Sequence, residues 1–206
     1  MLRKLLVPLL IIATTSGTAV SVAYASHGHD DNNSINRELK RVKRATQQFR
    51  KLSVAQDAGY GLLLDKDGIA CIDMPDMGAM GVHYAKGAIV PDGAIDPLTP
   101  EAVVYEPDEH GRLRLVALEY VVFKDAWDAQ HASPPSLFGQ EFNSTPVGNR
   151  FDLPAYYSLH VWLYKNNPAG MFEVWNPNVT CTPGNDDGQG DDHHGHHGDD
   201  HAGQDG

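Results

Sequence analysis

The run LRLVALEYVVF, from Leu113 to Phe123, restricts the fold of this chain more than any other segment. Its β-branched and aromatic side chains predict a long strand in an antiparallel sheet. Because side chains alternate along a strand, one face is expected to carry Leu113, Leu115, Ala117, Glu119, Val121 and Phe123. Glu119 is then a single carboxylate in an apolar row. A buried carboxylate needs a cation, a metal ion or a proton, because an unpaired buried charge is unstable.

The rest of the compact region alternates short strand candidates with turns rich in Gly, Pro and Asp. The candidates are residues 79–84, 102–105 and 156–164, and PDEHGR predicts a hairpin turn before the long strand. Upstream, between a capping Ser34 and Gly59, apolar residues recur at helical spacing: Ile35, Leu39, Val42, Phe49 and Leu52. Together these features predict an α+β domain, in which an N-terminal amphipathic helix packs on an antiparallel sheet or partial barrel.

The helical segment is basic, whereas the body that follows it is acidic. Residues 34–55 hold seven Lys and Arg and one Glu, and residues 56–181 hold seven basic and seventeen acidic residues. The acidic body argues against a nucleic-acid-binding protein. The helix is expected to pack its apolar face on the domain and to keep its charges in water. The alternative is an envelope protein that docks to an anionic membrane or a partner through this basic helix.

The two ends of the chain differ in composition from the middle. A basic start, an apolar run and the motif Ala23-Tyr24-Ala25 predict a signal peptide that is cleaved before Ser26. We therefore expect a secreted or periplasmic protein without a transmembrane segment after cleavage. The predicted organisation is a signal peptide over residues 1–25, a disordered mature N-terminus over 26–33, one domain over 34–182 and a disordered His/Asp/Gly-rich tail over 183–206.

Cys71 and Cys181 are the two cysteines of the chain. In an exported protein, an even number of cysteines favours a disulfide over two free thiols. This bond would close a loop of about 110 residues and join the end of the domain to a segment near its start. The sequence contains no CxxC pair, so a cysteine-based metal site is not expected.

The candidate metal site consists of His83, Glu119 and His160, each predicted to lie in the middle of a strand. Two histidines and one carboxylate are a common ligand set for divalent Zn, Cu, Fe or Mn, and they leave coordination positions open. The residues that share a face with His83 are the small Ala79 and Gly81, which leave room beside the imidazole. We expect a transition-metal-binding domain that, if it is an enzyme, acts on a small organic molecule.

Other interpretations of these residues stay open. In the main alternative the domain binds a small molecule without metal, Glu119 and His160 form a buried hydrogen-bonded pair, and the pocket is lined by Tyr84, Tyr156, Trp162 and Tyr164. Further candidates for the pocket are His131 and Glu106. Glu119 is also expected to find a partner in Arg114 or Arg150 if no metal binds. Glu101, Glu106 and Glu119 lie close enough in sequence to leave glycoside hydrolysis open.

The tail carries clustered histidines between glycines and aspartates. Neutral imidazoles bind Zn, Cu and Ni, so His193, His194, His196, His197 and His201 are predicted to gather metal as an accessory to the domain. A solvated, pH-sensitive tail without a metal role is the alternative.

Several segments resemble a group of exported bacterial proteins that share their order along the chain and have no assigned activity. The segments are GAMGVHYAKGAIV, PEAVVYEP, LRLVALEYVV, PPSLFGQEF and LHVWLYKNNPAGMFEVWNPNVTC. The resemblance spans most of the domain, from about Ala45 to Cys181, and does not extend to the tail. It implies export and no particular reaction, so the expected site rests on residue chemistry.

Overall fold

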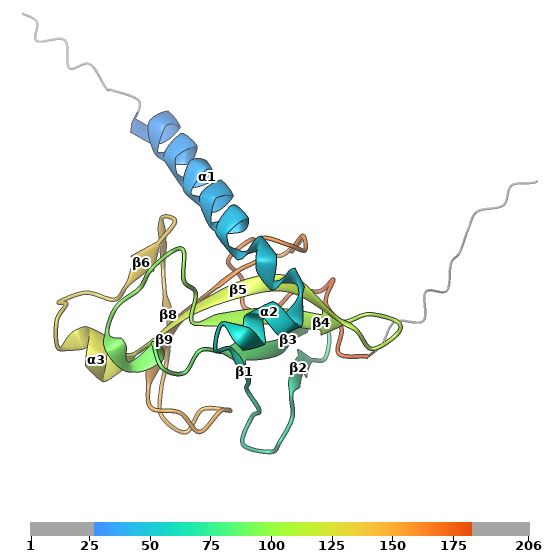
Figure 1. Ribbon diagram of the computed structural model, residues 1–206. Helices are drawn as coiled ribbons and strands as arrows, with labels where there is room; N and C mark the ends of the chain where they lie inside the picture. Colours follow the sequence, from blue (N-terminus) through green and yellow to red (C-terminus); the bar gives the residue numbers. More distant parts are fainter. Residues whose placement is uncertain (1–26, 183–206) are drawn as a thin grey trace, which may run out of the picture.

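A computed structural model describes residues 27–182 of the chain (Figure 1). The N-terminal part is helical, with α1 over His27–Thr46, the short 3-10 helix η1 over Gln47–Arg50 and α2 over Leu52–Asp57. The main sheet is built from β1 (Gly61–Leu62), β2 (Cys71–Met74), β3 (Gly78–Ala85), β4 (Ala102–Pro107), β5 (Leu113–Phe123), β8 (Asn143–Thr145) and β9 (Tyr156–Val161). The remaining elements are η2 (Val90–Asp92), α3 (Lys124–Asp128) and the small hairpin of β6 (Ser136–Leu137) and β7 (Gln140–Glu141).

The main sheet is antiparallel, in the order β1-β3-β4-β5-β9-β8, with β2 also paired to β3. The predicted strand Leu113–Phe123 is β5, and it lies between β4 and β9 in the centre of the sheet. The structure therefore confirms an α+β fold with one main helix and an antiparallel sheet.

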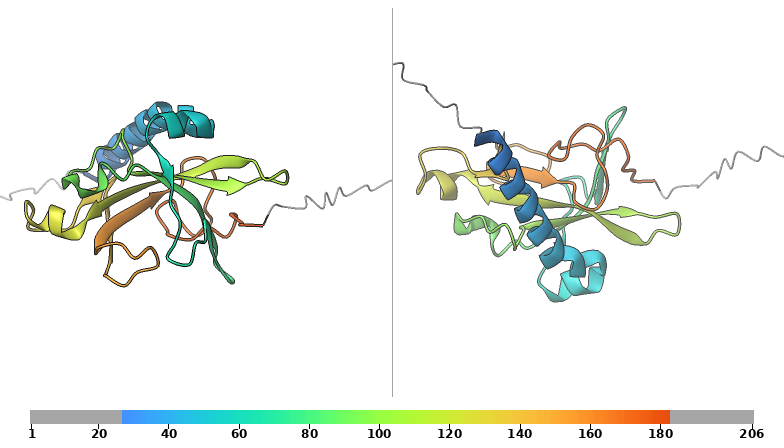
Figure 2. Two further views of the ribbon diagram at one scale, coloured as in Figure 1. Left: turned by 60° about the horizontal axis from the view of Figure 1, so that its bottom comes forward. Right: turned by 90° about the horizontal axis from the view of Figure 1, so that it is seen from above.

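Helix α1 lies across one face of the sheet (Figure 2). Leu39 and Val42 of the helix are buried in the largest apolar cluster, which also contains Leu118 and Tyr120 of β5 and Leu159 of β9. The basic side chains of α1 are exposed. The helix therefore packs its apolar face on the domain, as expected. The sheet covers the face that would otherwise insert into an anionic membrane.

The helical region differs from its prediction at both ends. α1 begins at His27, upstream of Ser34, so Ser34 is not its cap and residues 27–33 are helical where disorder was predicted. Its far end is at Thr46, where the hydroxyl donates to the Val42 carbonyl at 2.8 Å and meets the Tyr164 hydroxyl at 2.8 Å. The predicted continuous helix thus continues as two shorter pieces, η1 and α2.

A β-bulge in β5 corrects the predicted alternation. Leu115 lies opposite Tyr105 and Ala117 lies opposite Val104, so Val116 is an extra residue on β5. Its carbonyl accepts the backbone N–H groups of Tyr164 and Lys165, at 3.1 and 3.2 Å. The bulge turns Leu115 into the helix-side cluster, so Leu113 and Leu115 do not share a face with Glu119 as predicted.

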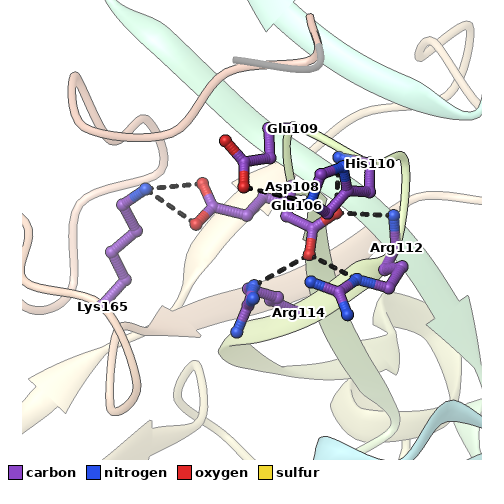
Figure 3. Close-up of polar contacts among 7 residues, drawn as sticks. All are labelled: Glu106, Asp108, Glu109, His110, Arg112, Arg114 and Lys165. Atoms are coloured by element: carbon purple, nitrogen blue, oxygen red, sulfur yellow. Dashed lines mark hydrogen bonds and ion pairs between the residues drawn. The ribbon is translucent and has the colours of Figure 1, made fainter. Parts of the chain in front are cut away.

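The predicted hairpin turn connects β4 and β5 (Figure 3). Asp108 accepts the backbone N–H groups of His110 and Arg112, at 3.0 and 2.8 Å, and its carboxylate also pairs with the Nε atoms of Arg112 and Arg114. Arg114 is therefore bound to the turn rather than to Glu119.

The C-terminal segment returns to the start of the sheet. Cys71 and Cys181 form the predicted disulfide, with Cα atoms 5.5 Å apart, and Asn176 pairs with Ala79 through two backbone hydrogen bonds. Val179 is buried beside Trp162 in a second, smaller apolar cluster on the face opposite α1. Among the helices of residues 27–182, none is both long and apolar enough to cross a membrane.

Candidate metal centre

Three neighbouring regions of the sheet bring His83, Glu119 and His160 together on the face opposite α1. Glu119 of β5 lies directly opposite His160 of β9. On its other side Glu119 lies opposite Ala102 of β4, and His83 of β3 reaches across that strand. His83 lies opposite Val104 of β4, two residues from the small Ala102, and its side chain comes within 3.4 Å of Glu119.

The distances within this group suit a metal ion. His83 Nε2 lies 3.4 Å from Glu119 Oε2 and 3.4 Å from His160 Nε2, and one donor atom from each residue lies within 4.8 Å of the other two. Ligands about 2.1 Å from a tetrahedral ion are separated by about 3.4 Å. These two separations of 3.4 Å therefore match the spacing around a tetrahedral ion, and this buried group could hold one.

Burial decides the charge of the group. His83, Glu119 and His160 expose 1%, 9% and 2% of their surfaces. Burial lowers the pKa of both imidazoles to about 4, so each is neutral and ready to ligate at neutral pH. Burial also raises the pKa of Glu119, against the opposing effects of His83 and of a hydrogen bond from Ser158. A divalent cation next to Glu119 would stabilise the ionised form of its carboxyl, which burial disfavours.

The Nδ1 atoms of the two imidazole rings are not fully satisfied. Nδ1 of His83 and Nδ1 of His160 are both buried without a hydrogen bond, although the Gly81 carbonyl lies near enough to raise the pKa of His83. His160 Nδ1 lies 3.5 Å from Glu119 Oε1. Buried polar atoms without partners are rare in folded proteins, which is an indication that the group is built for a purpose other than packing.

Phe151 and Ser158 belong to this site, and the sequence reasoning did not assign them. The Phe151 ring meets His83 edge-on, with centroids 6.1 Å apart. Ser158 could have been found, because it lies on the same strand face as His160 and two residues away. No sequence pattern indicated Phe151, because it lies in the irregular segment between β8 and β9.

The additional pocket residues are divided between different places. Glu106 binds Lys165 Nζ through both oxygens, at 2.7 and 2.6 Å (Figure 3), and His131 is exposed and stacked on Trp127 with ring centroids 3.7 Å apart. Both were candidates for the pocket, and the structure contradicts this: Glu106 has its own cation, and the short helix α3 ends beside His131 at the surface.

The predicted aromatic lining also divides between the two faces. Tyr156 and Trp162 lie on the face of His160, and the Trp162 ring is nearly parallel to that of His160, at 6.1 Å. Tyr84 and Tyr164 pack against the helix-side cluster instead, because Tyr84 neighbours His83 in its strand and β9 ends before Tyr164. The four aromatic residues therefore do not line one pocket. The predicted signal peptide and the five tail histidines lie outside the described residues.

Glu101 is a second buried carboxyl near the site. It is 2% exposed, and its Oε2 accepts the backbone N–H of Val121 at 3.0 Å, just beyond the end of the β4 ladder. Burial raises its pKa to about 8, although that hydrogen bond opposes the shift. The folded protein thus keeps a proton on Glu101 at neutral pH.

This proton predicts a pH dependence of stability. The folded pKa of Glu101 lies above its ordinary value of 4.5, so its contribution is complete below about pH 4.5 and is lost as the pH rises through about 8. Glu101→Gln stays uncharged and keeps an acceptor for Val121. Relative to this variant, the wild type is expected to lose roughly 3 kcal/mol of unfolding free energy between pH 5 and 8. Urea unfolding of both proteins at three pH values measures the difference, and an unchanged difference would contradict the assignment.

Comparisons with protein-family models, with curated proteins and with solved structures gave no match. The function of the site is therefore argued from its geometry and chemistry alone.

Proposed function

We propose that this protein is an exported transition-metal-binding protein whose domain holds one divalent ion through His83, Glu119 and His160. The observation that carries the proposal is the meeting of three buried donors from β3, β5 and β9, with two donor separations of 3.4 Å. Zinc is the ion that best suits two imidazoles and one carboxylate at this tetrahedral spacing. Copper, iron and manganese accept the same kinds of ligand.

The charge balance of the buried group supports the same proposal. Neutral imidazoles bind a metal without first losing a proton, and burial keeps both in this form. A cation would favour the ionised form of Glu119, which burial disfavours. An ion held by these three residues would keep a position for water or substrate and would supply Lewis-acid chemistry toward a small organic molecule.

The histidine-rich tail is proposed to gather metal for the domain. Its five histidines and seven aspartates offer many weak sites without a fixed set of ligands. In this arrangement the tail raises the amount of metal near the protein, and the domain holds a single ion in a defined geometry.

The test separates the two kinds of site in the full-length mature chain. In one version the five tail histidines, His27 and His29 are replaced by asparagine, so the domain alone supplies clustered imidazoles. After loading with Zn²⁺ and gel filtration, elemental analysis is expected to find about one ion per chain in this version. The unmodified chain is expected to hold more. Absence of zinc from the substituted version, with zinc still bound by the unmodified chain, would assign metal binding to the ends and refute the domain site.

A further inference from the structure

A cavity of about 230 Å³ lies beside the candidate metal centre on the same face of the sheet, and Glu119 is the one of the three donors that lines it. Its walls are mainly apolar, and Val90, Val121, Phe151, Leu153 and Tyr156 contribute to them. Val90, Val121 and Tyr156 form a buried cluster with Leu153 packed against it, so these walls belong to the folded core. The exposed Gly87 also borders the cavity, which gives it access to solvent.

The polar groups of the cavity are Glu101 and Glu119. Glu119 belongs at once to the cavity and to the group of donors, so a molecule in the cavity reaches the same carboxyl that faces His83 and His160. Phe151 likewise borders the cavity and touches the edge of the His83 ring. The cavity thus adjoins the candidate metal centre through Glu119 and Phe151, and its walls are mainly apolar.

The size and the walls of the cavity restrict its occupant. An apolar cavity of about 150 Å³ is large enough for benzene, so 230 Å³ has room for a ring that carries one substituent or a second small ring. A peptide or an oligosaccharide exceeds this volume, and a single sugar or another strongly polar molecule would leave its hydrogen-bonding groups unpaired against Val90, Val121 and Leu153. Two carboxyls in an otherwise apolar lining disfavour an anionic body and favour a neutral molecule with one polar group.

We propose that this cavity binds a small aromatic or alicyclic molecule with a single hydroxyl, carbonyl or amine group. The ring lies among Val90, Val121, Leu153 and Tyr156, and the polar group lies at the Glu119 end. The contact of that group with an ion rests on the proposed function, whereas the binding of the ring does not. The inference therefore names the class of substrate that the metal centre would receive.

Phenol is a suitable probe, because it is neutral and combines one ring with one hydroxyl. Binding is measured by ligand-observed NMR on the full-length chain in which the five tail histidines, His27 and His29 are asparagine, first freed of metal with a chelator and then loaded with Co²⁺. We expect one saturable site in the metal-free protein, with a Kd of about 1 mM or lower. Phenol is also expected to change the visible absorption of the Co²⁺ form, because its hydroxyl reaches the ion.

Two substitutions test whether phenol binds in this cavity. Leu153→Trp fills the cavity from its irregular wall, and Gly87→Trp covers its entrance, where an added Cβ meets nothing within 4 Å. Each is expected to weaken phenol binding at least tenfold. Leu98→Trp is the matched control, since Leu98 is exposed and does not border the cavity, and it is expected to leave binding unchanged. Thermal melting shows which variants are folded.

The outcomes separate this inference from the proposed function. Absence of saturable phenol binding to the metal-free protein, or binding that both folded variants retain, overturns the cavity inference whatever the metal content. Phenol binding by a protein that takes up no Co²⁺ supports the cavity and refutes the metal centre. Phenol binding that leaves the absorption of bound Co²⁺ unchanged overturns the placement of the polar group.

Discussion

Replacing His160 by alanine is expected to weaken zinc binding to the domain by at least about 100-fold. Removing a residue that only hydrogen-bonds to a metal ligand has a smaller effect, about 10- to 100-fold. The imidazole supplies one of three donors, and a small side chain at this buried position cannot replace it. The variant is made in the chain whose tail histidines, His27 and His29 are asparagine, so that weak sites do not hide the change. Competition with a chromophoric chelator measures the affinity.

Controls distinguish a lost ligand from a damaged fold. His131→Ala makes the same chemical change at an exposed histidine and is expected to keep full affinity. Glu119→Gln keeps the shape of the side chain while it removes the charge, and it is expected to weaken binding as well. Excess zinc should raise the melting temperature of the parent chain and leave those of His160→Ala and Glu119→Gln nearly unchanged. Unaltered zinc affinity in both variants would rule out the site.

The second large effect is expected from loss of the disulfide. The Cys71→Ser/Cys181→Ser double variant should lose about 3–5 kcal/mol of unfolding free energy, because the bond restricts an unfolded chain over a sequence separation of 110 residues. Guanidinium unfolding with and without a reducing agent measures the loss. Reduction should destabilise the wild type and leave the double variant unaffected. A difference below about 1 kcal/mol would show that the core contacts of Val179 and the Asn176–Ala79 pairing hold the segment by themselves.

The elements with strong local patterns could be predicted from the sequence. β5 has its predicted bounds, because its eleven residues are rich in β-branched, aromatic and other apolar side chains and turn residues precede them. The disulfide was predicted from the expected export and an even cysteine count, and the structure confirms it. The meeting of His83, Glu119 and His160 followed from their positions in the middle of strands, where polar residues need partners.

The features that could not be predicted from the sequence depend on contacts between segments that are far apart along the chain. The Val116 bulge depends on the backbone N–H groups of Tyr164 and Lys165, which no local pattern around Val116 reveals. Because of this bulge, a strict alternation misplaced Leu115. One part of the cavity wall comes from the irregular segment that contains Phe151 and Leu153, which has neither helical nor strand periodicity.

The neighbours of the three donors in the chain lie in the core on the opposite side of the sheet. Leu118 and Tyr120 flank Glu119, Leu159 and Val161 flank His160, and Val82 and Tyr84 flank His83, all packed beneath α1. Each donor is therefore fixed from both sides, and the spaces between donors cannot widen without disturbing that core. A stiff frame of this kind discriminates between ions by radius: it suits bonds of about 2.1 Å and excludes Ca²⁺, which needs six to eight oxygen ligands at about 2.3–2.6 Å. The preference of the centre for one ion over another would then depend on the packing of the helix-side core, although no ion contacts that face of the sheet.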